Sequence, residues 1–209
     1  MNPLLAELAD DAATLARLHD RELDTATLAA LQELGFPDNL ALLPRDAADQ
    51  AAWQAMREAL AAVPPAPTLD ELDALAAAYA ALYLTGTHGI SPCESVWLDE
   101  DRLTCRAPMF ELRALYRAAG LAAADWRRRP DDHLVLQLLY LAHQLRRGAS
   151  ADFAADELAG MLDAHLLRWL PDFAGRIAAC GAAPFYAGLA GLTLAWCRTL
   201  RAALGTTHA

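Results

Sequence analysis

The stretch that decides the fold reads Asp132-His133-Leu134-Val135-Leu136-Gln137-Leu138-Leu139-Tyr140-Leu141. Its apolar residues fall on every face of a helical wheel, which is typical of a helix with no side left for solvent. The run therefore predicts a central, buried helix that ends near Gly148. The neighbouring segments are more amphipathic, so we expect them to pack around this helix.

Outward from this stretch, the sequence predicts helix nearly everywhere. Alanine and leucine dominate, β-branched residues are scarce, and no run alternates with period two as a strand would. Capping residues, prolines and glycines divide the chain. Helices are expected to begin near Pro3, after Asp24, after Asp132 and at Pro184. Further helices are expected from Asp46 to Ala62, Thr68 to Leu84, Pro108 to Gly120, Ser150 to Trp169 and Pro171 to Gly181. Residues 85–107 are expected to be irregular. The fold class is thus all-α, a single-domain globular bundle of about nine or ten helices over residues 1–209.

Composition limits the kind of partner. The 209 residues are 56% hydrophobic and 21% charged, so the chain can bury a core and is not of the disordered class. The net charge of −10 disfavours nucleic acid and anionic lipid as partners and favours basic ones. Solubility alone also explains an acidic surface, and on charge alone this is the favoured interpretation.

The cysteines and the N-terminus indicate a cytoplasmic protein. Cys93, Cys105, Cys180 and Cys197 match no zinc pattern and read as reduced thiols, and the first residues do not form a secretory signal. No charge occurs from Ile177 to Cys197, but glycines, a proline and many alanines interrupt this run. We expect it to be buried core and not an integral membrane segment.

No motif of common enzyme chemistry is present. The chain lacks a glycine-rich phosphate loop, GxSxG and HExxH, and no two of its six histidines stand four residues apart. We therefore expect no catalytic residue, no metal site and no cofactor, and a protein that is not an enzyme. The alternative left open is a metal- or nucleotide-dependent helical protein that uses Asp132 and His133.

Two segments are unusual. Residues 86–101 are loop-like, yet they carry apolar and aromatic residues beside acids, and Pro130–Leu134 places two carboxylates and an imidazole at the entry to the buried helix. Asp131 or Asp132 is expected to be the N-cap of that helix, which is worth about 1 kcal/mol. The functional alternative is a polar anchor at the rim of a groove.

At these segments the sequence resembles the TorD/DmsD/NarJ family of chaperones for molybdoenzyme maturation, in its TorD-like branch. The resemblance runs in order from about residue 79 to 186. It rests on Tyr79, Leu82, Tyr83 and Gly86; Pro92, Glu94, Ser95, Val96, Trp97 and Leu98; Pro130, Asp131, Asp132, His133 and Leu134; His165, Leu166, Trp169, Leu170, Pro171 and Phe173; and Phe185 with Tyr186.

The resemblance implies a TorD-like helical fold and a cytoplasmic, client-specific chaperone. Such a protein binds the catalytic subunit of a molybdopterin oxidoreductase, commonly at its twin-arginine signal peptide, and holds it until the cofactor is inserted. Further implied partners are molybdenum-cofactor biosynthesis proteins, and the implied state is a monomer or a domain-swapped dimer. The implied peptide-binding residues are Tyr83, Pro92, Glu94, Ser95, Trp97, Leu98, Asp131, Asp132 and His133.

The physics of such a peptide divides these residues into two groups. The apolar part of the peptide is expected to lie in a hydrophobic groove, for which the candidates are Tyr83, Trp97, Leu98, Tyr140 and Trp169. Core packing is the favoured expectation for Trp169, whereas groove and core stay equally open for Trp97. Its arginines are expected to meet Glu94, Asp99, Glu100, Asp101, Asp131 and Asp132. Cys93, Arg129 and Gln137 depart from the family pattern, and the last two remove negative charge near this site.

Overall fold

The structure, a computed structural model, describes residues 2–125, 127–150, 153–181 and 183–205. Its helices share one hydrophobic core, which confirms the predicted all-α fold. Their bounds are α1 Pro3–Asp20, α2 Thr25–Glu33, α3 Ala47–Ala61, α4 Leu69–Tyr79, α5 Ser95–Leu98, α6 Ala107–Ala118, α7 Leu134–Gly148, α8 Ala155–Met161, α9 Leu167–Cys180 and α10 Pro184–Gly205. A π-helical turn, η1 (Ala80–Leu84), continues α4, and a second, η2 (Leu162–Leu166), joins α8 to α9.

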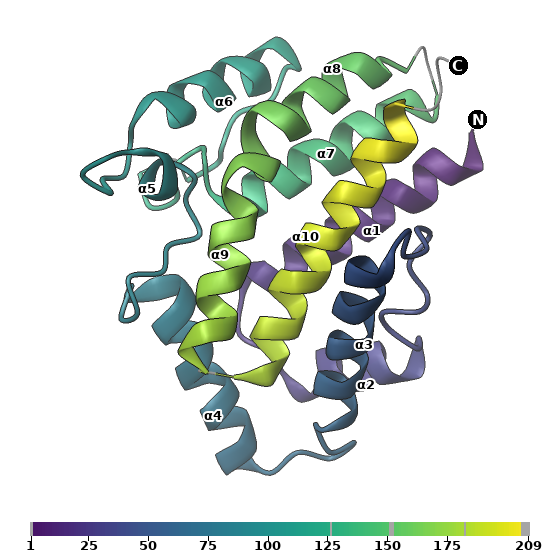
Figure 1. The fold of residues 1–209 in the computed structure, drawn as a ribbon, viewed down its shortest axis with the longest axis vertical. Helices are drawn as coiled ribbons and strands as arrows, with labels where there is room; N and C mark the ends of the chain where they lie inside the picture. The colour runs from purple at the N-terminus through teal and green to yellow at the C-terminus, as the bar shows by residue number, and fades with distance from the viewer. Residues whose placement is uncertain (1, 126, 151–152, 182, 206–209) are drawn as a thin grey trace.

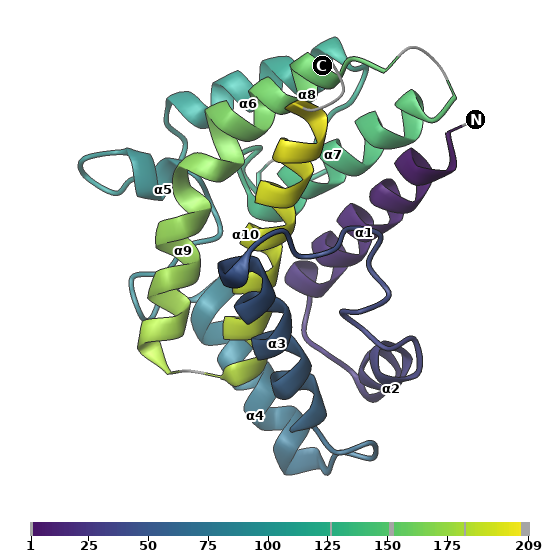
Figure 2. The same cartoon turned by 45° about the vertical axis from the view of Figure 1, so that its right-hand side comes forward.

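Helix α10 runs through the middle of the molecule (Figure 1) and packs against α3 and α9. Most of the uncharged run that ends at Cys197 belongs to this helix, and its Tyr186, Leu189 and Trp196 are fully buried. The second strong pairing is α1 along α7, seen side by side in Figures 1 and 2. In the described ranges, none of the helices has both the length and the apolar character needed to cross a bilayer.

Helix α7 is mostly buried, as predicted, but not on every face. Leu134, Leu138 and Leu141 have no exposed surface, whereas Leu136 is half-buried and Leu139 is 45% exposed. The prediction of an all-round buried helix was therefore wrong at Leu139, because the neighbouring helices leave that side of α7 open to solvent.

The starts of α2, α3 and α4 were predicted correctly from the sequence. Asp24 and Asp46 accept backbone hydrogen bonds as the N-caps of α2 and α3. Thr68 and Glu71 form a complete capping box at the start of α4. Local chemistry is sufficient to set these helix starts, because each cap satisfies donors within its own first turn.

Two predicted boundaries between residues 150 and 171 were wrong. Helix α8 begins at Ala155 without a side-chain cap, so Ser150 is not its N-cap. Pro171 does not start a helix but lies inside α9, which continues the π-helical turn η2. A proline there removes one backbone hydrogen bond. The helix persists because Trp169, Leu170 and Phe173 are fully buried around it.

Residues 85–107, which were predicted to be irregular, also contain the short helix α5.

The crossing of α10 with α3 depends on Gly188. A Cβ atom there would lie 3.0 Å from Met56 Cα, whereas one at Gly191 would meet only Ala52 Cβ at 4.0 Å. We predict that Gly188→Ala lowers the free energy of unfolding by about 1–3 kcal/mol through overpacking. Gly191→Ala should raise it by up to about 1 kcal/mol through helix propensity. Urea unfolding followed by circular dichroism measures both, and equal effects of the two variants would contradict this close approach.

Candidate functional site

The two unusual segments meet at the start of α7. Cys93 and His133 form an isolated antiparallel bridge. The Leu134 N–H donates to the Pro92 carbonyl at 2.7 Å, and the Glu94 N–H donates to the Asp132 carbonyl at 3.1 Å. Segments that are forty residues apart in the sequence thus form one surface, as the sequence interpretation required.

Asp132 ties the two segments together and does not cap α7. Its carboxylate has no exposed surface, and its Oδ2 accepts the backbone N–H of Ser95 at 2.7 Å. The N-cap of α7 is His133, whose Nδ1 accepts the Val135 N–H at 3.2 Å. The prediction of Asp131 or Asp132 as the cap was therefore wrong. Asp132 serves the start of α5, a partner that the local sequence does not reveal.

His133 is an uncharged imidazole. Burial, and secondarily the charge of Arg129, lowers its pKa from 6.5 to about 3. Because Nδ1 accepts a hydrogen bond, the ring proton resides on Nε2. His133 therefore presents a neutral donor to its surroundings and not a cation.

Asp131 anchors α6 to the same corner. Its Oδ2 accepts from Arg113 Nε at 3.0 Å and from Arg113 Nη2 at 2.7 Å. Its carbonyl accepts from the Tyr116 hydroxyl at 2.9 Å. The carboxylate is 3% exposed, so it acts inside the protein.

Glu94 lies at the centre of a buried network of Glu94, Asp132, Gln137 and His165. Its carboxylate accepts from Gln137 Nε2 at 3.1 Å and lies 3.1 Å from His165 Nδ1. Gln137 also donates to the Asp132 carbonyl at 2.9 Å. Burial raises the pKa of the Glu94 carboxyl. An acid in place of Gln137 would add a negative charge where a donor is needed, so this departure from the family pattern fits the interior of this chain.

A cleft of about 650 Å³ opens between the two segments and η1. Tyr83, Leu84, Pro92, His133 and Leu136 contribute to its lining. Its charged residues come in pairs: Arg129 bridges Asp20 at 2.5 Å, and Arg128 lies 3.9 Å from Asp125. The cleft therefore combines apolar side chains with acids and arginines that pair with one another, and it is not the acidic surface that the sequence suggested.

The predicted groove residues separate in space. Trp97 is half-buried, donates to the Ser91 carbonyl at 2.8 Å and packs edge-on against Phe173. Leu98 is half-buried against the core. Trp169 is fully buried, which agrees with its expectation as core. Tyr140 lies away from the cleft and faces α6 and α8.

The acids divide likewise. Glu94, Asp131 and Asp132 are buried with partners in their own chain, and Asp99 bridges Arg106 at 3.3 Å. Glu100 and Asp101 are exposed in the loop after α5. Of the six acids predicted to meet the arginines, only Glu100 and Asp101 are exposed and make no ion pair within the described residues.

Sequence reasoning missed the residue that holds Tyr83. His19, fully buried on α1, lies 2.7 Å from the Tyr83 hydroxyl through Nδ1 and 2.9 Å from Thr193 Oγ1 through Nε2. Thr193 donates to the Leu189 carbonyl, so His19 Nε2 donates to Thr193 and Nδ1 accepts from Tyr83. A lone histidine on an amphipathic helix gives no sign of this role.

The alternative metal site is not favoured. Among the described residues, no group of three or more histidine, cysteine, aspartate and glutamate side chains could hold a metal ion. Asp132 Oδ2 and His133 Nδ1 are both taken by backbone N–H groups.

Comparison with known proteins agrees with the fold and the motifs. The family model described as "Nitrate reductase delta subunit" matches residues 44–175. The chain belongs to this family, the TorD/DmsD/NarJ family that its motifs resemble.

Curated relatives are named "Chaperone protein TorD". The protein from Shewanella sp. (strain ANA-3) is 31% identical over 192 residues, which cover 87% of this chain and 86% of that one. The protein from Salmonella arizonae is 30% identical over 187 residues, 88% and 84% of the two chains. The protein from Vibrio cholerae serotype O1 is 33% identical over 129 residues, so the match spans 58% of its length.

Proposed function

We propose that this protein is a client-specific chaperone and not an enzyme. It binds the catalytic subunit of a molybdopterin oxidoreductase in the cytoplasm, at the twin-arginine signal peptide, and holds it until the cofactor is inserted. The observation that carries the proposal is the cleft between Ser91–Cys93 and Pro130–His133, in a chain whose relatives are named chaperones. Further partners are molybdenum-cofactor biosynthesis proteins, and the protein acts as a monomer or a domain-swapped dimer.

The predicted site residues take two roles in this proposal. Tyr83, Pro92 and His133 contact the peptide, because they line the cleft. Glu94, Ser95, Asp131 and Asp132 position the cleft walls, because their polar atoms bond within the chain. Trp97 and Leu98 pack against the core and so support residues 91–98 beside the cleft.

Apolar contact supplies most of the affinity. The apolar section of the peptide lies along Leu84, Pro92 and Leu136, while Glu100 and Asp101 attract its arginines from the exposed loop after α5. Exposed ion pairs are worth only about 0–1 kcal/mol each, so these acids mainly raise the association rate. The association rate of the peptide should accordingly fall at high salt, but the peptide should still bind.

The test replaces an exposed residue in the cleft. Leu84 is 66% exposed and lines the cleft, and Leu43 is 76% exposed in the connection between α2 and α3. We predict that Leu84→Arg weakens binding of a labelled twin-arginine peptide panel about tenfold, because it removes apolar surface and repels the arginines. Leu43→Arg, with the same change in charge, should bind like wild type. Fluorescence anisotropy measures both, and equal affinities for the two variants would reject the cleft as the binding site.

A further inference from the structure

A second apolar depression lies on another face of the molecule, between α6 and α8, which run side by side in Figures 1 and 2. This α6–α8 groove has a volume of about 520 Å³. The half-buried Leu115 of α6 and the mostly buried Tyr140 of α7 and Met161 of α8 form its apolar floor. No residue lines both the groove and the cleft, so the two are separate sites.

One wall of the groove is made of small residues. Gly160 and Ala164 stand four residues apart, on one face of α8 and η2, and both are exposed. A Cβ atom at Gly160 would meet nothing within 4 Å, so this position is open and the packing of the chain itself does not require a glycine. Small side chains allow the backbone of a second helix to approach closely.

Two acids flank this apolar surface. Glu111 of α6 and Glu157 of α8 are exposed, and neither makes a salt bridge or hydrogen bond in the described part of the chain. In the cleft, by contrast, Arg128 and Arg129 pair with the acids. The lining of the α6–α8 groove therefore has an acid on each of two opposite walls and no lysine or arginine among its described residues, which complements a basic partner.

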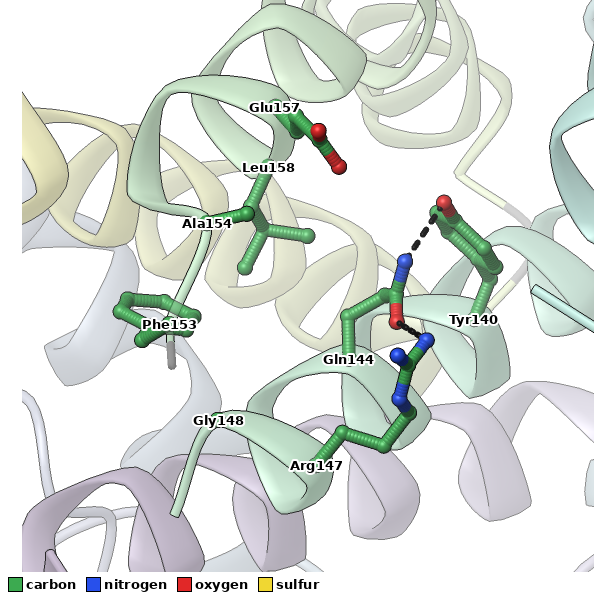
Figure 3. Close-up of a pocket in the computed structure, with 8 residues that line it drawn as sticks. All are labelled: Tyr140, Gln144, Arg147, Gly148, Phe153, Ala154, Glu157 and Leu158. Atoms are coloured by element: carbon green, nitrogen blue, oxygen red, sulfur yellow. Dashed lines mark hydrogen bonds between the residues drawn. The ribbon is translucent and has the colours of Figure 1, made fainter. Parts of the chain in front are cut away.

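The groove continues along α8 into a smaller cavity of about 80 Å³ (Figure 3). Tyr140 and Glu157 line both depressions, whereas Arg147, which donates to Gln144 Oε1 at 3.2 Å, lines only the smaller one. Figure 3 shows Tyr140 and Gln144 on α7 facing Glu157 and Leu158 on α8, and the Tyr140 hydroxyl accepts from Gln144 at 2.8 Å. From Ala154 to His165 the wall is about 16 Å long at 1.5 Å per residue, which suits a partner helix of roughly three turns.

We propose that the α6–α8 groove binds an amphipathic, basic helix of a partner polypeptide. The apolar stripe of that helix lies on Leu115, Tyr140 and Met161, its backbone passes over Gly160 and Ala164, and its lysine or arginine side chains reach Glu111 and Glu157. This inference goes beyond the proposed function, because it adds a docking surface separate from the cleft and independent of it.

The test uses the full chain and a fluorescein-labelled 16-residue synthetic helix with leucines on one face and arginines along its two edges. Gly160→Leu fills the groove, and Glu111→Lys/Glu157→Lys reverses its charge; each should raise the Kd at least tenfold. The matched control Glu7→Lys/Glu33→Lys makes the same charge change at exposed acids elsewhere and should stay within twofold of wild type. Circular dichroism checks that each variant is folded. A peptide with glutamates in place of the arginines should bind at least tenfold more weakly.

Three results would overturn the inference. One is a Kd for Gly160→Leu within twofold of wild type, and another is equal affinity for the glutamate peptide. The third is a wild-type dimer in sedimentation that Gly160→Leu converts to monomer, because a second copy would then occupy the groove. Leu84→Arg separates the two sites: it should weaken the twin-arginine peptides and leave the synthetic helix unaffected. If Gly160→Leu alone weakened the twin-arginine peptides, the groove would stand and the cleft proposal would fail.

Discussion

Trp169→Ala is expected to lower the free energy of unfolding by about 3–5 kcal/mol, the usual range for removing a fully buried large aromatic side chain. Trp169 has no exposed surface and packs edge-on against Phe173 at a ring distance of 5.3 Å. The neighbouring Pro171 prevents a regular hydrogen bond within α9, so the helix there depends on buried side chains. Urea unfolding at constant protein concentration measures the change.

Trp97→Ala is the comparison for this prediction. Trp97 is half-buried and makes one indole hydrogen bond, so its loss should destabilise the protein less than the loss of Trp169. Trp169→Phe retains an aromatic ring and should recover much of the stability that Trp169→Ala loses. A Trp169→Ala variant with wild-type stability but weakened peptide binding would show that Trp169 belongs to a binding surface and not to the core.

The second large effect is a loss of stability in acid. Burial lowers the pKa of His19 from 6.5 to about 3. In the unfolded chain His19 takes up a proton as the pH falls through about 6.5, while the folded chain resists until about pH 3. Stability is therefore lost as the pH falls between these values, by about 2 kcal/mol from pH 8 to pH 5 for one such histidine. His133, with its pKa also near 3, acts in the same direction.

A buried carboxyl opposes this trend. Burial raises the pKa of Asp11 from 3.8 to about 6, so the folded chain takes up this proton first and gains stability as the pH falls between these values. The test therefore compares the pH dependence of the free energy of unfolding between each variant and the wild type. In His19→Gln the stability loss from pH 8 to pH 5 should shrink by about 2 kcal/mol. The exposed His88→Gln should retain the wild-type dependence, and an unchanged dependence in His19→Gln would refute a neutral, buried His19.

Several signals that act within one helical turn were predicted correctly from the sequence, although the expected cap at Ser150 was not. Asp24, Asp46 and the Thr68–Glu71 box begin helices as expected, because a cap bonds to donors only two or three residues away. Gly181 ends α9 in the left-handed conformation for an equally local reason.

Signals that depend on distant partners were misread. Asp132 has the residue type of a cap, yet its acceptor oxygen goes to Ser95 across a gap of 37 residues, and His133 caps α7 instead. Pro171 has the residue type of a helix start, yet burial of its neighbours carries the helix through it. Tyr140 and Tyr83 were assigned to one groove, but helices from different parts of the chain place them at different depressions.

The sequence by itself determined the helical class, most helix starts, the family motifs and the pairing of the two segments that build the cleft. Only the tertiary structure decided which polar side chains remain available to a partner. The physical reason is that a carboxylate is recognisable from its residue type, whereas its burial and its hydrogen-bond partner depend on packing between remote helices. Glu94 and Asp132 are consequently used inside the protein. Glu111 and Glu157, which no motif marks, are the acids beside an apolar groove that make no ion pair within the described part of the chain.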